Sequence, residues 1–549
     1  MVDIYENCER LTREMVAIPS VNGSSGEKDI GIYIEKFFRN LPYFNEHPEN
    51  LVIQELSGDA LGRRNILAIL EGSVGNSKKT MILHGHTDTV GVEDYGILKE
   101  ACFDPDELEK RLGEAPISEE VRKDLESGLY MFGRGAVDMK SGDAVLMAIA
   151  ERLSERLEEI NGNLIFAFNP VEENMHTGMI ESLDILLKLQ KERDYEYLFA
   201  INTDYTCPLY MGDTHNYVYT GAVGKLLPSF YILGKSTHVG QCLEGFDASM
   251  VAARLVDKIN LNTDFCDGYD DEYSLPPSVL KMTDLKDFYN VQTAQETFVY
   301  FNYFAHDNNI RDISEKLMKT ARDAILEVRG KITESAAKYY KMAGIKSDIP
   351  EYEPQVYDYR TIHTLAKEKY SGNLEGLITV ELSKIEKTTT DIREKMMYIV
   401  KTLCQIAGIS APAIVFFYTP PYCPHNTLHQ EIPREHELVK AVKEILKSME
   451  EEENIDYKML HFYPSLSDSS YLKIDDPKDS VEELVSNFPR MEELYPIPVD
   501  KIQSLDIPAF TFGTYGKDAH KWTERVHKPY TFGVLPKLIE KTIRYYLEA

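Results

Sequence analysis

The 549-residue sequence predicts an α/β protein into which a second, α+β domain is inserted. Short apolar runs typical of buried strands alternate with helical patterns in the N-terminal part of the chain. The middle of the chain instead carries alternating, sheet-like stretches and long helical ones. A last buried run, AFTF at 509–512, returns to the first pattern only after this block. We therefore expect one α/β domain at 1–216 and 421–549, interrupted by the second domain at 217–420.

The expected elements follow from the periodicity of the apolar residues. Residues 30–41 (IGIYIEKFFRNL) have the apolar spacing of an amphipathic helix. In a second helix, expected at 142–160, Val145, Ile149 and Leu153 recur every fourth residue. The expected strands of the first domain are the apolar runs at 65–70, 80–83, 164–168, 197–201 and 509–512. In the inserted domain we expect strands at 227–234, 297–305 and 412–418, and a long helix at 313–340.

The composition indicates a soluble globular protein. Hydrophobic residues make up 43% and charged residues 27%, and no apolar run reaches the roughly 18 residues of a membrane helix. Seven cysteines without a C-x-x-C pair are typical of a reducing compartment, and the N-terminus is unlike a signal peptide, so we expect a cytoplasmic protein that does not bind membranes. The net charge of -30 argues against a nucleic-acid partner and is best interpreted as a solvated acidic surface.

Side chains able to bind a metal or move a proton follow four of the predicted strands. They are His84, His86 and Asp88 after 81–83, Glu172 and Glu173 after 164–168, Asp204 after 197–201, and His520 in the loop after 509–512. Open α/β sheets place their sites beyond the carboxyl ends of the strands, so we expect these residues to converge in one crevice. A glycine-rich turn at 133–142, GRGAVDMKSG, contributes Asp138.

This residue set has the chemistry of a two-metal site. Carboxylates and imidazoles together suit Zn²⁺ or a similar divalent cation. Three carboxylates and two histidines complete two sites only if one carboxylate is shared, which sets the cations about 3.5 to 4 Å apart. In the pair Glu172–Glu173, one side chain can bind metal while the other accepts a proton from the attacking water. Each motif alone is a weak signal, because paired glutamates usually lie on the surface.

The order of the motifs resembles one known family. GHTDTV, FGRGAVDMKSG, VEEN, NTDYT, STHVG (236–240) and GKDAHKWTERV follow one another as in the M20 family of co-catalytic metallopeptidases and amidohydrolases. The similarity runs from about residue 18 to the C-terminus. It implies a mixed-sheet α/β/α catalytic domain with an inserted lid and dimerisation domain. The length and the segment PSLSDSSYL (464–472) resemble a longer branch known as arginine-utilisation proteins.

The resemblance implies a ligand set for two divalent cations, expected to be Zn²⁺, with Co²⁺ or Mn²⁺ also tolerated. His86 and Asp204 would hold one cation, Glu173 and His520 the other, and Asp138 would bridge them. The implied reaction is hydrolysis of an amide or peptide bond in a small substrate, an N-acyl amino acid or a short peptide.

The resemblance also implies roles for residues that do not bind metal. Glu172 would be the general base and proton shuttle, and Asp88 would orient the imidazole of His86. His238 resembles the histidine that, in dimeric relatives, reaches into the partner's active site, so we expect a homodimer formed through the inserted domain. Asp468 in SLSDSSY would line the site, and Glu524 would support His520 from one helical turn away.

The chain departs from the family pattern at one substrate contact. Relatives end a strand of the lid with Asp-x-Arg, whereas this chain has Asn302 in the sequence YFNYF. An amide lacks the two-pronged grip of a guanidinium, so recognition of a free substrate carboxylate by Asn302 stays open.

Three other interpretations were weighed. Cys423-x-His425-x3-His429 imitates a metal motif but lies in a proline-rich loop, where a structural role is expected. The H-G-H turn is similar to that of barrel-type amidohydrolases, yet the inserted sheet domain breaks the regular strand-helix repeat of a barrel. A non-catalytic, metal-stabilised binding protein of the same fold is the alternative from another class, and the retained Glu172 argues against it.

Overall fold

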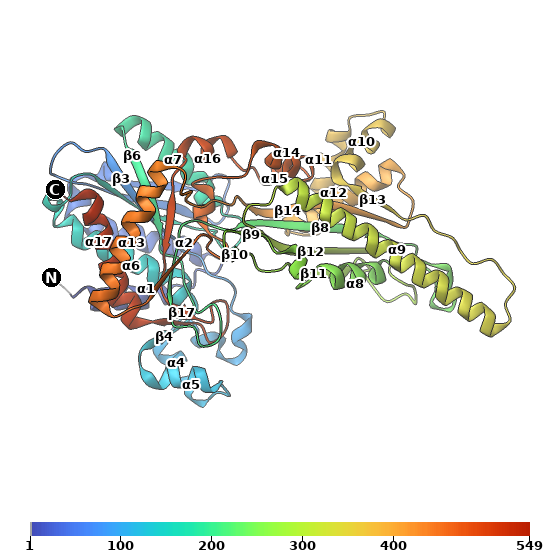
Figure 1. Cartoon of the computed structure of the whole chain (residues 1–549), viewed down its shortest axis with the longest axis horizontal. Coiled ribbons are helices and arrows are strands. Elements are labelled where there is room, and N and C mark those ends of the chain that lie inside the picture. Colours follow the sequence, from blue (N-terminus) through green and yellow to red (C-terminus); the bar gives the residue numbers. More distant parts are fainter. Residues whose placement is uncertain (1–2, 549) are drawn as a thin grey trace. The chain divides into compact units, whose positions relative to one another are not determined.

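A computed structural model describes residues 3–548 of the chain, which form two compact units (Figure 1). The first unit comprises the chain up to Val223, the segment Asn426–Ile474, and the chain from Pro498 onward. The second unit comprises Gly224–His425 and Asp475–Ile497. No helix among residues 3–548 is both long and apolar enough to cross a membrane.

The unit boundaries differ from the predicted domain limits at both ends of the insertion and in the placement of one later segment. The inserted unit begins at Gly224 and its main segment ends at His425, a few residues beyond the predicted 217–420. The first limit is the start of β8 at Gly224, and the second lies two residues after the end of β14 at Cys423. Residues 475–497, which we had expected in the first domain, also belong to the second unit.

The first unit is built on a mixed eight-stranded sheet of order β1-β2-β5-β3-β6-β16-β7-β15. Its strands are β1 (Leu51–Glu55), β2 (Arg64–Glu71), β3 (Lys79–His86), β5 (Asn163–Asn169), β6 (Glu196–Asn202), β7 (Asn216–Tyr219), β15 (Tyr457–Leu460) and β16 (Ala509–Phe512). The central strands β5, β3, β6 and β16 are parallel neighbours. They are buried along almost their whole length, as their continuous apolar runs predict. A small second sheet consists of β4 (Tyr130–Phe132), β17 (Gly516–Lys517) and β18 (Arg525–His527).

Helices cover both faces of this sheet. The helices of the unit are α1 (Ile4–Val16), α2 (Gly26–Asn40), α3 (Pro42–Glu46), α4 (Pro105–Glu114), α5 (Glu119–Ser127), α6 (Ser141–Ser154), α7 (Thr177–Arg193), α13 (Pro433–Glu453), α16 (Val499–Leu505) and α17 (Leu535–Leu547). On β2, Ile66 and Ala68 share the main core with α6, whereas the neighbouring Asn65 donates a hydrogen bond to Gly178 of α7. Successive strand residues face opposite sides, so α6 and α7 lie on opposite faces. The α/β fold class and the mixed sheet of the first domain are confirmed.

The second unit is an α+β structure with a five-stranded sheet of order β11-β12-β8-β14-β13. Its strands are β8 (Gly224–Leu233), β11 (Ser278–Asp284), β12 (Glu296–Ala305), β13 (Gln355–Asp358) and β14 (Ala413–Cys423), with a small hairpin of β9 (Gly268–Tyr269) and β10 (Glu272–Tyr273). Its helices are α8 (Ala248–Ile259), α9 (Ile310–Ala343), α10 (Tyr359–Lys369), α11 (Leu374–Ile385), α12 (Ile392–Ala407), α14 (Lys478–Ser486) and α15 (Met491–Leu494). The long helix α9 starts at the side-chain cap of Asn309 and ends at Gly344, which has a left-handed backbone.

Candidate metal centre

The parallel strands β5, β3, β6 and β16 bring the predicted site residues to one edge of the sheet. β3 extends to His86 instead of ending at Leu83, so His86 is its last residue. Gly85 is required before it, since a Cβ there would lie 2.4 Å from Asp143 Oδ1. The pair Glu172–Glu173 follows β5, and Asp204 follows β6. The sheet topology therefore explains why strand-end residues that are distant in the sequence converge.

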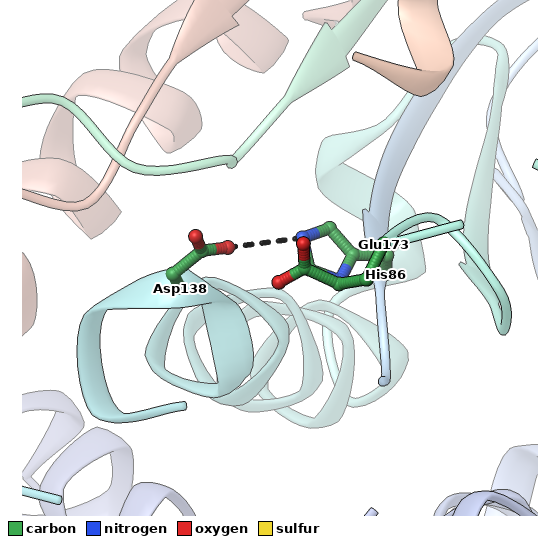
Figure 2. A group of neighbouring side chains, drawn as sticks. All are labelled: His86, Asp138 and Glu173. Atoms are coloured by element: carbon green, nitrogen blue, oxygen red, sulfur yellow. Dashed lines mark hydrogen bonds and ion pairs between the residues drawn. The ribbon is translucent and has the colours of Figure 1, made fainter. Parts of the chain in front are cut away.

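Asp138 lies at the centre of the group. Its Oδ1 is 3.1 Å from Nε2 of His86, a contact drawn as a dashed line in Figure 2, and its Oδ2 is 2.9 Å from Nε2 of His520. The ligand atoms of His86, Asp138 and Glu173 all lie within 4.8 Å of one another. One carboxylate thus faces two imidazoles with its two oxygens, which is the geometry that a shared ligand needs.

The remaining groups lie on the two sides of Asp138. On one side, Nε2 of His86 is 3.9 Å from Oδ1 of Asp204 and 3.8 Å from Oε2 of Glu172. On the other side, Nε2 of His520 is 3.0 Å from Oε1 of Glu173. We call His86, Asp138, Glu173, Asp204 and His520 the five-residue cluster. The structure brings all five together, and the side chain of His520, 46% exposed, is on the solvent-accessible side.

Glu524 supports the cluster in a way that differs from the expected one. Residues 518–524 form turns, not a helix, so Glu524 does not lie one helical turn from His520. Its Oε1 instead accepts the backbone N–H groups of Val137 and Asp138, at 3.2 and 3.3 Å. Its Oε2 is 2.6 Å from the buried guanidinium of Arg134. Arg134 is therefore structural, and Glu524 fixes the turn that carries Asp138.

Asp88 contacts both the imidazole of His86 and the glutamate pair. The backbone carbonyl of Asp88, at 3.1 Å, is the nearer partner of His86 Nδ1, whereas the carboxylate is 3.7 Å away. That carboxylate accepts the N–H groups of Glu172, at 2.9 Å, and Glu173, at 3.2 Å. Asn22 donates a further hydrogen bond to it. The side chain of Asp88 therefore holds the glutamate pair, and its main chain orients the imidazole.

The electrostatics of the cluster favour bound protons or cations. Burial raises the pKa of Glu172 well above its usual range, and burial with the nearby Asp138 raises the pKa of Asp204 to about 8. Burial lowers the pKa of His520, but Asp138 and Glu173 outweigh this effect and raise the pKa to about 12. Asp143, fully buried behind His86, adds a carboxyl group that has no hydrogen-bond partner among the described residues. Such a concentration of buried carboxylates needs positive charge in place of bulk water.

The donor set fits divalent cations. Two imidazole nitrogens and three carboxylates with little solvent exposure are borderline-hard ligands that suit Zn²⁺, Co²⁺ or Mn²⁺. Within residues 3–548, His86, Asp138 and Glu173 are the one group of His, Cys, Asp and Glu side chains whose ligand atoms have the spacing of a metal site. In the Cys423-x-His425 motif, the ring of His425 instead pairs with Asp476 at 3.2 Å, which agrees with the expected structural role.

Two predicted residues, His238 and Asn302, lie in the second unit. His238 is exposed and precedes a short 3₁₀ turn (Val239–Glu244), where its Nδ1 accepts the N–H of Gly240. Asn302 is half-buried on β12, opposite Ser278 of β11. Their roles toward a partner's site and toward substrate stay predictions.

Asp468 is buried within the first unit and does not lie on an open surface. It is 3% exposed, and its Oδ1 is 2.9 Å from Nδ1 of His176. The observed partner of Asp468 is His176, a residue that sequence reasoning missed, and the expected position of Asp468 along the substrate site stays a prediction. The segment SLSDSSY was a usable signal for Asp468, whereas nothing in the sequence set His176 apart.

Known proteins resemble this chain in sequence and in fold. A family model described as Peptidase family M20/M25/M40 matches residues 82–548. Protein RocB of Bacillus subtilis (strain 168) is 36% identical over 544 residues, covering 99% of this chain and 95% of that protein. A tripeptidase from Staphylococcus aureus has a TM-score of 0.52 at 14% identity, with 98% of each chain covered. Human carnosine dipeptidase 1 has a TM-score of 0.51 at 11% identity, covering 99% of this chain and 97% of that one.

Proposed function

Because the chain belongs to the peptidase family M20/M25/M40, and is thus a metal-dependent hydrolase, we propose that it cleaves an amide or peptide bond in a small substrate. The proposed substrates are N-acyl amino acids or short peptides. One observation carries the proposal: Glu172 lies 3.8 Å from His86 on one side of Asp138, while its neighbour Glu173 contacts His520 on the other. One glutamate can therefore bind metal while the other transfers protons.

We propose that the five-residue cluster holds two divalent cations. His86 and Asp204 would hold one, Glu173 and His520 the other, and Asp138 would serve both, since its two oxygens face the two imidazoles. Cations bound there would acidify water and polarise the scissile carbonyl group. Zn²⁺ is the proposed native metal, and Co²⁺ or Mn²⁺ would suit the same donors.

Glu172 is the proposed proton carrier. Its side chain is buried, its Oε2 faces His86, and its N–H is fixed by Asp88. Because burial raises its pKa, the carboxyl group is suited to take a proton from the attacking water and to give it to the leaving amine. Asp88, through its hold on the pair Glu172–Glu173, keeps both glutamates in place.

The proposed substrate class rests on the similar proteins and on one residue of the second unit. The structurally similar proteins include a tripeptidase and a dipeptidase, which supports a short substrate. Asn302 is the proposed substrate contact of the second unit, and its amide would form neutral hydrogen bonds in place of an arginine's ion pair.

We also propose a homodimer formed through the second unit. β11 is an edge strand of its sheet, and its Leu280 and Met282 are 54% and 43% exposed. An exposed strand edge with apolar side chains offers both hydrogen bonds and burial to a second copy. The exposed His238 of this unit would then serve the partner's site. The seven cysteines, which include no C-x-x-C pair, support the proposed reducing compartment, such as the cytoplasm.

Glu172→Gln tests the proposed function. The amide cannot accept the proton, so turnover of N-acetyl-amino acids and dipeptides should fall by about 100- to 10,000-fold. Elemental analysis should still find the metal content of the wild-type protein. The matched control is Glu192→Gln, on the exposed surface of α7, which should retain full activity.

Retained turnover in Glu172→Gln would contradict the role of this residue as the base. A wild-type protein that is metal-loaded yet hydrolyses no member of the panel would contradict the proposed substrate class.

A further inference from the structure

Three consecutive side chains, Ser467, Asp468 and Ser469, each contact a different segment close to the metal centre. We call this segment the strap; it leads into the short 3₁₀ turn η7 (Asp468–Tyr471). All three residues are buried, and Ser467 Oγ also accepts the N–H of Ser469, which closes the turn. The strap is thus a preorganised element that does not face solvent.

The outer residues of the strap reach the ends of β6 and β3. Ser467 Oγ accepts a hydrogen bond of 3.0 Å from Nδ2 of Asn202, whose own Oδ1 accepts the N–H of Asp204 at 3.1 Å. Ser469 Oγ is 3.1 Å from Nε2 of His84, two residues before His86. Both contacts are made to a residue two positions before a member of the five-residue cluster, Asp204 or His86.

The central residue of the strap contacts His176, which lies beside Glu172. Asp468 Oδ1 is 2.9 Å from Nδ1 of His176, and the same nitrogen is 3.9 Å from Oε1 of Glu172. Oε1 has no hydrogen-bond partner among the described residues, whereas Oε2 lies on the His86 side. The imidazole of His176 therefore lies between two carboxylates and against the face of Glu172 that points away from the cluster.

The backbone that carries Glu172 needs this kind of support. Val171 has φ 72° and His176 has φ 53°, so both ends of the turn that contains the glutamate pair are left-handed. A β-branched residue in that region is strained, and such a conformation persists only where the surroundings impose it. The bond from Asp468 acts on the second of these two residues.

We propose that Asp468 and His176 are positioning residues that hold the carboxylate of Glu172 in its working orientation, with the strap as their support. This inference rests on the proposed function of Glu172 as the general base. Neither residue touches the reacting atoms; His176 lies against Glu172, with 3.9 Å between Nδ1 and Oε1, and Asp468 forms a hydrogen bond to His176. Asp468 is therefore required for the rate of the reaction and not for substrate binding.

Asp468→Ala and Asp468→Asn test the proposal as a pair. Alanine removes the hydrogen bond to His176, whereas asparagine keeps an oxygen acceptor of the same reach. With the best N-acetyl-amino acid or dipeptide of the wild-type enzyme, Asp468→Ala should lower kcat about tenfold or more, with KM and metal content little changed. Asp468→Asn should restore most of kcat. Ser470→Ala is the matched control, because the buried hydroxyl of Ser470 has no hydrogen-bond partner among the described residues.

Crystal structures of the metal-loaded variants give a readout that does not depend on activity. Glu172 should adopt one conformer in the wild-type protein and in Asp468→Asn, and a displaced or divided one in Asp468→Ala. Unchanged Glu172 and unchanged kcat in Asp468→Ala would overturn the positioning role and leave the proposed function intact. An equal loss in both Asp468 variants would also overturn it. A displaced Glu172 in a protein without hydrolytic activity would support the positioning role and contradict the proposed function instead.

Discussion

Asp88 shows how much of the centre depends on contacts that residue types alone do not reveal. The metal-competent side chains could be predicted, because several histidines and carboxylates, each a weak signal alone, follow buried strands whose carboxyl ends meet at one edge of the sheet. Asp88 was expected to orient His86, yet its carboxylate turned toward the backbone of Glu172 and Glu173. Which oxygen meets which donor is decided by rotamers and loop conformation, and these have no signature in a single sequence.

Asp88→Asn should therefore weaken the glutamate pair more than the imidazole. The amide provides one acceptor where the carboxylate provides two, so one of the two backbone N–H groups loses its charged partner. We expect kcat to fall about tenfold or more and metal affinity about 10- to 100-fold, as measured by steady-state kinetics and chelator competition. Asn22→Ala, which removes only one neutral donor to Asp88, should change both by less than about threefold. Equal behaviour of the two variants would contradict the role given to Asp88.

At the scale of elements, the positions of the strands were predicted more accurately than the ends of the elements and the assignment of segments to the two units. The apolar runs located the four central strands, because strands buried on both faces read as continuous apolar stretches. β3 nevertheless extends to His86, since its polar end stays paired with β5 and β6. The helix expected at 142–160 ends at Ser154. The helices of residues 475–497 join the second unit through contacts with distant parts of the chain, which local periodicity cannot show.

Ser480→Ala tests the attachment of residues 475–497 to the second unit. Ser480 Oγ accepts the N–H of Ile310 at the start of α9, at 2.8 Å, in a buried position. Removing the acceptor leaves a buried donor unsatisfied, so the free energy of unfolding should fall by about 1 to 3 kcal/mol in urea titrations. Ser335→Ala, on the exposed surface of α9, should change it by less than about 0.5 kcal/mol. If Ser480→Ala were as stable as this control, the hydrogen bond between Ser480 and Ile310 would not contribute to the attachment of residues 475–497.

For the whole molecule, the alternation of strands and helices was enough to predict an α/β protein with an inserted α+β unit. The motifs in order were enough to predict the family, because five side chains from separate segments that converge on one site constrain a sequence strongly. The relation of the second unit to the substrate could not be predicted in the same way. It depends on His238 and Asn302, which lie in a unit whose own fold does not determine what they reach.

Anomalous diffraction from crystals of the zinc-loaded protein, collected at the zinc absorption edge, tests the central claim most directly. We expect two peaks about 3.5 to 4 Å apart, with the carboxylate of Asp138 between them, His86 and Asp204 beside one, and Glu173 and His520 beside the other. A single peak, or peaks away from these five residues, would contradict the two-metal centre.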